Sequence, residues 1–384
     1  MPVIVQMQAV RRLRRWLKWS PIVLGHTRSL SRAIAGLRAN LAAATIASLV
    51  LAGCSAASSP SGRAVSRAVV IVSGGGAISP FTTPDQACSD EEGFLPAGNT
   101  DSALREYLLE RGKQVYTAPA MVPWGTVTEP DPKSFGPFKD CPIVLPESMT
   151  IMSAGDIDES GEKLARFVGY LHSEYGITDI DLVGHSNGGL YSRAATRILK
   201  QTDAPVTVRS LTMIGTPNNG SVPGGYTWGE FGKADCLGNE FCETFNDSWL
   251  NYAAQSDLGL NREDTMRYLN GPPGWNPAQA GYLEGIPVTL LAGTHFSAKG
   301  GDARMWPYDG ITSRYSAWAE GVSDEVIPWR TCWQGPLTHS IFVSDAAGLT
   351  WDTALTWNSE ALARVNQALD EADTALSRPN RQGC

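Results

Sequence analysis

One serine of this 384-residue chain is flanked by glycines in an unusual way. The stretch DLVGHSNGGL, residues 181–190, places Ser186 two positions after Gly184 and two before Gly188. A serine hydroxyl becomes a nucleophile when a base removes its proton and donors stabilise the oxyanion that forms. On a sharp turn between strand and helix, the glycines would prevent collisions and the hydroxyl would project from the sheet. We therefore predict that Ser186 is a catalytic nucleophile.

Two main-chain donors are expected to stabilise the oxyanion. The N–H of Asn187 would begin the helix after the serine, where the helix dipole favours negative charge. The second donor should come from the loop after the first strand, VSGGGA at 72–77, because its glycines let the main chain approach a substrate. We predict the N–H of Gly75, with that of Gly76 as the alternative.

A fold with such an elbow orders its catalytic residues as nucleophile, acid and histidine. His339 follows the last predicted strand on a loop, fits this order, and is predicted to be the general base. His172 is expected on a helix in a surface or packing role. His185 adjoins the nucleophile in sequence but is expected to point elsewhere. His295 precedes the best acid candidate and is therefore in the wrong order.

Asp309 and Asp324 are the two candidates for the acid. Asp309 follows the strand predicted over 286–294, so it would lie at the carboxyl edge of the sheet with the serine and the histidine. Asp324 would begin the strand predicted over 324–333 and would lie at the opposite edge. We predict that Asp309 holds the tautomer of His339 and stabilises its imidazolium.

Strands and helices alternate around these residues. Strand-like runs occupy 67–77, 113–120, 177–186, 208–217, 286–294 and 324–333, and helical spacing occurs over 158–176 and 188–201. This alternation predicts an α/β fold, a mostly parallel central sheet with helices on both faces. The interval 218–285 interrupts it with aromatic residues and glycines, and we predict that it forms an aromatic-rich cap over the carboxyl edge, where ligands bind. The alternative is a loop that packs only against the body.

Three motifs resemble those of the secreted bacterial triacylglycerol lipases of the α/β-hydrolase fold. They are GHSNGG around Ser186, GTPNNGS at 215–221 and YDGITSRYSA around Asp309, followed by a loop histidine. The resemblance covers roughly 67–345 and is strongest at these segments. It implies an α/β-hydrolase fold and hydrolysis of acyl esters, with Asp309 as the acid.

The chain departs from this family at three places. Ser73-Gly74 stands where family members usually have His-Gly, which weakens the assignment of the second oxyanion donor. Asn218 stands where histidine is common. Many of these lipases bind a structural calcium through an aspartate just after the catalytic histidine, but Asp345 lies too far from His339 to match. We therefore expect no cofactor, and a structural calcium stays an unsupported alternative.

The first 53 residues are typical of an export signal. They hold eight of the 31 Lys and Arg residues and none of the 39 Asp and Glu residues, and a short apolar run follows the basic region. Leu51-Ala52-Gly53-Cys54 resembles the lipobox of bacterial lipoproteins, which implies that Cys54 is lipidated and holds the protein on the bacterial membrane. An ordinary signal peptide is the alternative. Residues 54–66 would be a flexible linker and 67–384 the catalytic domain.

Removal of residues 1–53 would make the chain more acidic than its formal charge of −8. Such a charge disfavours nucleic acid as a partner, and we expect a monomer. Export to an oxidising compartment favours disulfides, which we predict in sequential order as Cys88–Cys141, Cys236–Cys242 and Cys332–Cys384. Metal binding by these cysteines lacks support, because the chain has no CxxC pair and no His/Cys cluster.

The sequence thus predicts an exported serine carboxylic-ester hydrolase, a lipase or an esterase, with an acyl-enzyme on Ser186. An aromatic cap suits an apolar acyl chain. Two alternatives stay open: a cell-envelope acyltransferase that uses the same three residues, and an inactive binding protein on the same fold. The second is disfavoured because every catalytic position is occupied by a suitable residue.

Overall fold

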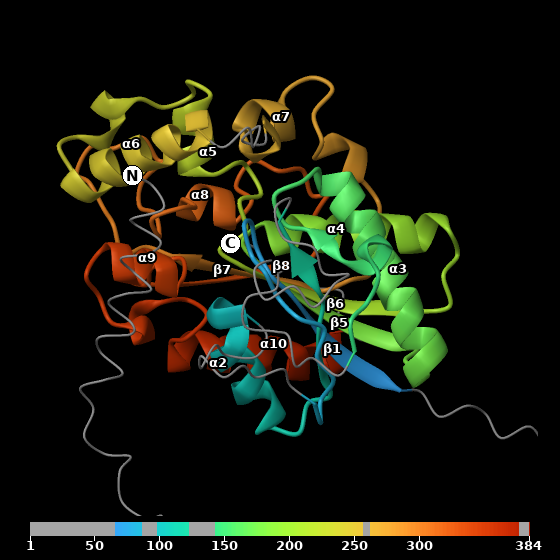
Figure 1. Ribbon diagram of the computed structural model, residues 1–384. Coiled ribbons are helices and arrows are strands. Elements are labelled where there is room, and N and C mark those ends of the chain that lie inside the picture. Colours follow the sequence, from blue (N-terminus) through green and yellow to red (C-terminus); the bar gives the residue numbers. More distant parts are fainter. Residues whose placement is uncertain (1–65, 87–97, 123–142, 256–261, 376–383) are drawn as a thin grey trace, which may run out of the picture. The chain divides into compact units, whose positions relative to one another are not determined.

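The computed structural model describes residues 66–86, 98–122, 143–255, 262–375 and 384. The chain divides into two units, Met1–Ala64 and Val65–Cys384, and the described residues belong to the second. Its centre is a six-stranded sheet in which every neighbouring pair is parallel (Figure 1). The strand order is β2 (Val115–Thr117), β1 (Arg67–Val72), β5 (Asp179–His185), β6 (Thr207–Ile214), β7 (Val288–Gly293) and β8 (Arg330–Gly335).

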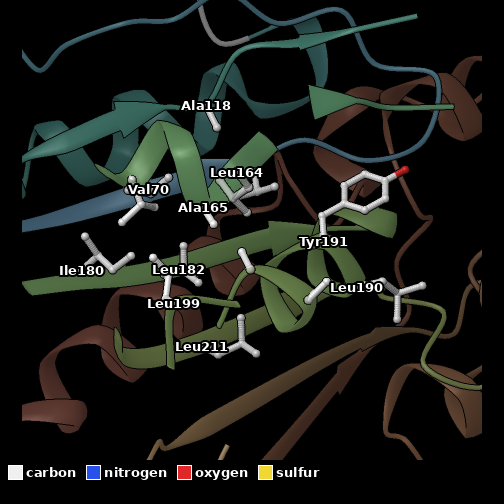
Figure 2. Packing of buried hydrophobic residues seen from close by; sticks show 14 of the residues in the cluster. Val70, Ala118, Leu164, Ala165, Ile180, Leu182, Leu190, Tyr191, Leu199 and Leu211 are labelled. Atoms are coloured by element: carbon white, nitrogen blue, oxygen red, sulfur yellow. The ribbon is translucent and has the colours of Figure 1, made fainter. Parts of the chain in front are cut away.

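Helices cover both faces of this sheet because its strands are apolar on both sides. Val70 and Val72 of β1 belong to the core under α3 (Ile157–Tyr175) and α4 (Asn187–Gln201), part of which is drawn in Figure 2. Val69 and Ile71 face the other core, which contains apolar side chains of α2 (Gly98–Leu109) and α10 (Ser359–Ala375). This two-sided burial is typical of parallel sheets, and it confirms the predicted fold class.

Local signals explain where α3 begins and ends. The Asp156 side chain accepts hydrogen bonds from the N–H groups of Asp158 and Glu159, which caps the first turn. Gly176 ends the helix in the left-handed region at φ 67°, a conformation that glycine adopts without steric cost. The helix predicted over 158–176 is therefore confirmed to within one or two residues.

Two strand predictions need correction. The strand predicted over 324–333 begins only at Arg330, because Val326 N–H donates to the Ser323 carbonyl in a turn and Pro328 has no N–H for a ladder. The strand predicted over 113–120 is split. Its first part is β2, whereas β3 (Ala120–Met121) pairs with β4 (Ile151–Met152) in a separate two-stranded sheet.

The segment 218–285, which we call the cap segment, lies between β6 and β7. It contains α5 (Val222–Thr227), α6 (Glu240–Gln255), α7 (Met266–Asn270) and 3-10 turns at Lys233–Cys236, Arg262–Asp264 and Pro277–Gln279 (Figure 1). Val222 N–H donates to the Ile311 carbonyl at 2.8 Å, and the Ser316 hydroxyl donates to the Gly220 carbonyl at 2.7 Å. The cap segment thus packs against the loop that follows β7, at the carboxyl edge of the sheet.

The described residues form two disulfides, Cys236–Cys242 in the cap segment and Cys332–Cys384 between β8 and the last residue. The predicted pair Cys88–Cys141 lies outside the described residues, as do Cys54 and the rest of the predicted export signal. Among the described helices, none combines the length and the apolar character needed to cross a membrane.

Candidate active site

Ser186 lies at the junction of β5 and α4 in a strained conformation. Its φ is 53° and its ψ is −132°, a combination that costs a non-glycine residue roughly 1–3 kcal/mol and persists only when the surroundings impose it. The Ser186 N–H donates to the Ile214 carbonyl of β6 at 2.8 Å, which ties the turn to the neighbouring strand. This is the nucleophile-elbow geometry expected of the G-x-S-x-G motif.

The flanking glycines are required by close contacts. A Cβ at Gly184 would lie 2.5 Å from the nitrogen of Gly189, in the first turn of α4. A Cβ at Gly188 would lie 2.1 Å from the carbonyl oxygen of Val72, at the end of β1. Both positions must therefore lack a side chain if α4 is to start directly behind the serine.

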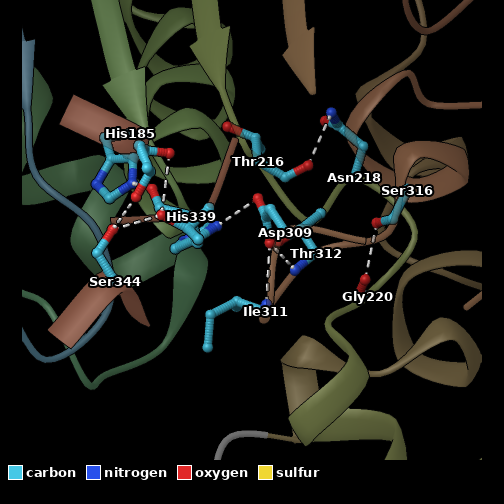
Figure 3. A network of polar contacts seen from close by, with 12 residues as sticks. His185, Thr216, Asn218, Gly220, Asp309, Ile311, Thr312, Ser316, His339 and Ser344 are labelled. Atoms are coloured by element: carbon cyan, nitrogen blue, oxygen red, sulfur yellow. Dashed lines mark hydrogen bonds and ion pairs between the residues drawn. The ribbon is translucent and has the colours of Figure 1, made fainter. Parts of the chain in front are cut away.

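His339 and Asp309 meet at the same edge of the sheet, although they come from loops after β8 and β7. The His339 Nδ1 lies 2.8 Å from the Asp309 Oδ2, and both side chains are buried (Figure 3). The other carboxyl oxygen, Oδ1, accepts hydrogen bonds from the N–H groups of Ile311 (2.9 Å) and Thr312 (2.6 Å). Because a carboxylate only accepts, Nδ1 carries the proton and Nε2 is left to accept one.

The sequence did not indicate which residues the His185 ring contacts. Its Nε2 lies 3.0 Å from the main-chain carbonyl oxygen of His339, and the two ring centroids are 4.8 Å apart. The residue next to Ser186 therefore contacts the residue predicted to be its base. The turns after β5, β7 and β8 thus bring Ser186, Asp309 and His339 to one region.

The other candidates have different surroundings. His172 Nδ1 contacts the Ile177 carbonyl at 2.8 Å beyond the end of α3, and His295 Nδ1 contacts the Pro336 carbonyl at 3.4 Å. Asp324 lies before β8, at the amino end of that strand, with its side chain 57% exposed and 3.5 Å from Arg330. This location agrees with the argument that favoured Asp309 over Asp324.

The loop after β1 packs closely against Ser186 and Asn187. A Cβ at Gly74 would lie 2.4 Å from the Ser186 Cβ, and one at Gly75 would lie 3.1 Å from the Asn187 Nδ2. Asn187 is the first residue of α4, so its N–H has no acceptor within the helix. The alternative donor, the Gly76 N–H, is instead bonded to the Ser153 carbonyl at 3.1 Å. Gly75 and Asn187 therefore stay the predicted donors.

Two acids near the site were missed by sequence reasoning. Asp101 of α2 is buried, and this burial raises its pKa to about 6 although the Ser73 hydroxyl donates to it at 2.6 Å. Its spacing from Leu104 and Leu108 already places it on the apolar face of the helix. Asp264 of the cap segment also has its pKa raised to about 6 by burial, opposed by a hydrogen bond with the Asn187 side chain.

The three departures from the lipase motifs have structural explanations. Ser73 bonds to Asp101, as described above. Asn218 is fully buried and accepts a hydrogen bond from the Arg193 guanidinium at 3.1 Å. Asp345 accepts one from the Trp351 indole at 2.9 Å. Across the described ranges, no group of three His, Cys, Asp or Glu side chains is arranged to hold a metal ion.

Comparison with known proteins adds a family match. Residues 149–230, which include β5, the elbow and α4, match a family described as an alpha/beta hydrolase of unknown function (DUF915). Over 61 residues the chain is 43% identical to triacylglycerol lipases of Pseudarthrobacter phenanthrenivorans and Burkholderia plantarii. That segment is 16% of this chain and only 18% and 16% of the two lipases.

Solved structures are more distant in sequence. The mature lipase BlEst2 of Bacillus licheniformis is 15% identical, with a TM-score of 0.37, and the match covers 78% of this chain and 91% of the lipase. An esterase of Pyrococcus furiosus is 13% identical with a TM-score of 0.38, covering 80% and 84%. The parallel sheet and the elbow at Ser186, together with the family match over 149–230, show that this chain has the α/β-hydrolase fold.

Proposed function

We propose that this chain is a serine hydrolase of carboxylic esters, a lipase or an esterase. The observation that carries the proposal is the buried contact of 2.8 Å between His339 and Asp309, beside the strained elbow at Ser186. Strained backbone conformations cluster at active sites, and a serine becomes a nucleophile when a base held by a third group takes its proton.

The proposed reaction has two halves. In the first, His339 Nε2 takes the Ser186 proton as Oγ attacks the acyl carbon, and the N–H groups of Gly75 and Asn187 stabilise the oxyanion. The ester C–O bond then breaks, and the imidazolium donates its proton to the departing alcohol. In the second half, water gives a proton to His339 and attacks the acyl-enzyme. The carboxylic acid leaves as Ser186 regains its proton.

Aromatic side chains beside the site support the proposal that the substrate carries an apolar acyl group. Phe241 stacks on Phe296 and Phe245 with centroid distances of 4.1 and 5.1 Å. Phe342, three residues after His339, is 45% exposed and packs edge-on to Phe245 at 6.3 Å. An acyl chain that covers such a surface gains about 0.8 kcal/mol per buried methylene.

A series of chromogenic esters of increasing acyl length tests this proposal. We expect hydrolysis by the purified protein, labelling of Ser186 by a fluorophosphonate, and loss of both in Ser186→Ala with an unchanged thermal midpoint. An unlabelled serine in folded protein would favour the binding-protein alternative. Transfer to added alcohols that exceeds hydrolysis would favour the acyltransferase.

We also propose that the protein is exported and lipidated at Cys54. The disulfides Cys236–Cys242 and Cys332–Cys384 support export, because such bonds are rare in reducing compartments. A clickable fatty acid fed to producing cells should label the protein and leave Cys54→Ser unlabelled. Equal labelling of both proteins would exclude lipidation at Cys54.

A further inference from the structure

A second histidine–aspartate contact lies behind His339. The His185 Nδ1 is 3.8 Å from the Asp101 Oδ1, and the two side chains are 5% and 1% exposed. At the other edge of the ring, His185 Nε2 contacts the carbonyl oxygen of His339 (Figure 3). His185 therefore bridges a buried acid and the main chain of the predicted base.

The direction of the hydrogen bond follows from the chemistry of the groups. A carbonyl oxygen only accepts, so the proton of His185 lies on Nε2. Burial, aided by repulsion from His339, lowers the pKa of His185 to about 3, so the ring is neutral over the range in which an esterase works. A neutral ring can hold this carbonyl without opposing the positive charge that forms on His339 during the reaction.

Asp101 connects the same ring to the oxyanion loop. Its Oδ2 accepts the Ser73 hydroxyl, which also lies 2.8 Å from the Ser79 hydroxyl. Its Oδ1 faces His185 and has no hydrogen-bond partner among the described residues. Since Ser73 precedes Gly74, which touches Ser186, a line of buried contacts runs from the oxyanion loop through Asp101 and His185.

Hydrogen bonds hold both main-chain groups of His339. Its N–H donates to the Asp309 carbonyl at 2.8 Å, and its carbonyl accepts from His185. Proton transfer needs the imidazole within about 2.6–3.2 Å of the serine oxygen, and a misplacement of about 1 Å can lower the rate about 10²-fold.

We propose that His185 is a positioning residue for His339, and that Asp101, held by the Ser73 hydroxyl, packs against the other edge of its ring. The inference rests on the proposed hydrolase function. It extends that function from three residues to a buried network that keeps the base and the oxyanion donors in register.

A matched pair of amides tests the proposal. In His185→Gln the amide nitrogen takes the place of Nε2 and reaches the His339 carbonyl. In His185→Asn the same amide is one methylene shorter and does not reach it. We expect kcat of His185→Gln to stay within about threefold of wild type, and kcat of His185→Asn to fall about 10- to 100-fold. KM should stay within about twofold in both, because the ring does not face the substrate.

Near-ultraviolet circular dichroism and thermal midpoints establish that each variant is folded. Equal kcat in the two folded variants overturns the inference. If His185→Asn does not fold, Ser73→Ala replaces it, because it removes the hydroxyl that bonds to Asp101 and Ser79 and leaves the His185 ring unchanged. Its kcat should fall with KM unchanged, and an unchanged kcat overturns the inference. Wild-type protein that neither hydrolyses esters nor reacts with a fluorophosphonate refutes the proposed function, and the inference with it.

Discussion

Asp309→Asn keeps the shape of the side chain but removes its charge and one acceptor. The N–H groups of Ile311 and Thr312 both point at Oδ1, so the amide oxygen must occupy that place. The NH2 group of the asparagine then faces His339 Nδ1. Because NH2 only donates, Nδ1 must accept, and the imidazole proton moves to Nε2, the atom that should take the proton of Ser186.

The wrong tautomer at this position lowers kcat by about 10⁴, which corresponds to about 5.4 kcal/mol of transition-state stabilisation. Asp324→Asn is the matched control. It makes the same chemical change in the same inter-strand loop, but at an exposed side chain on the other edge of the sheet. We expect its kcat to stay within about twofold of wild type, because exposed ion pairs contribute about 0–1 kcal/mol.

The assay is initial-rate hydrolysis of one chromogenic ester at saturating concentration, with thermal midpoints measured on the same preparations. Comparable loss of kcat in both variants, or retained kcat in folded Asp309→Asn, would refute the assignment of the acid and the tautomer argument behind it.

Two further predictions concern stability. Gly188→Ala should abolish soluble expression, because the added Cβ would overlap the Val72 carbonyl. In the control Gly169→Ala the added Cβ has no neighbour within 4 Å, and the protein should melt within a few degrees of wild type. A stable Gly188→Ala protein would contradict the close contact. Burial raises the pKa of Glu263 from 4.5 to about 7, so the folded state binds its proton more tightly and stability falls as pH rises through that range. Urea melts at pH 5 and pH 8 give the loss of unfolding free energy between these two pH values. This loss should be smaller in Glu263→Gln than in wild type. In the exposed control Glu110→Gln it should equal the wild-type loss. Equal losses in wild type and Glu263→Gln would contradict this.

Local sequence was sufficient to predict the elbow at Ser186. The strand, the glycines at 184 and 188 and the following helix are contiguous, and each glycine is required by contacts within or beside that turn. The choice of Asp309 over Asp324 needed only one non-local rule, that parallel strands end at the same edge. The structure places the two acids at opposite ends of strands, as that rule requires.

The surroundings of the site could not be predicted in the same way. The bond from His185 to His339 joins residues 154 positions apart, and no periodicity marks it. Asp101 reaches the site only because α2 packs against the face of the sheet that contains Val69 and Ile71. The presence of an aspartate in the sequence does not indicate which residue it contacts. The Gly76 N–H is ruled out as an oxyanion donor only by its hydrogen bond to the Ser153 carbonyl, a contact between distant parts of the chain. Such assignments depend on tertiary contacts rather than local pattern.

The bridge between Cys332 and Cys384 has a topological consequence. Its cysteines have a sequence separation of 52, and the bond closes a covalent ring that contains His339 and α10. If a protease cuts the backbone once inside this ring, the disulfide still joins the two fragments covalently. Nicked and intact molecules would therefore migrate together in electrophoresis without reductant and separate only when a thiol is added.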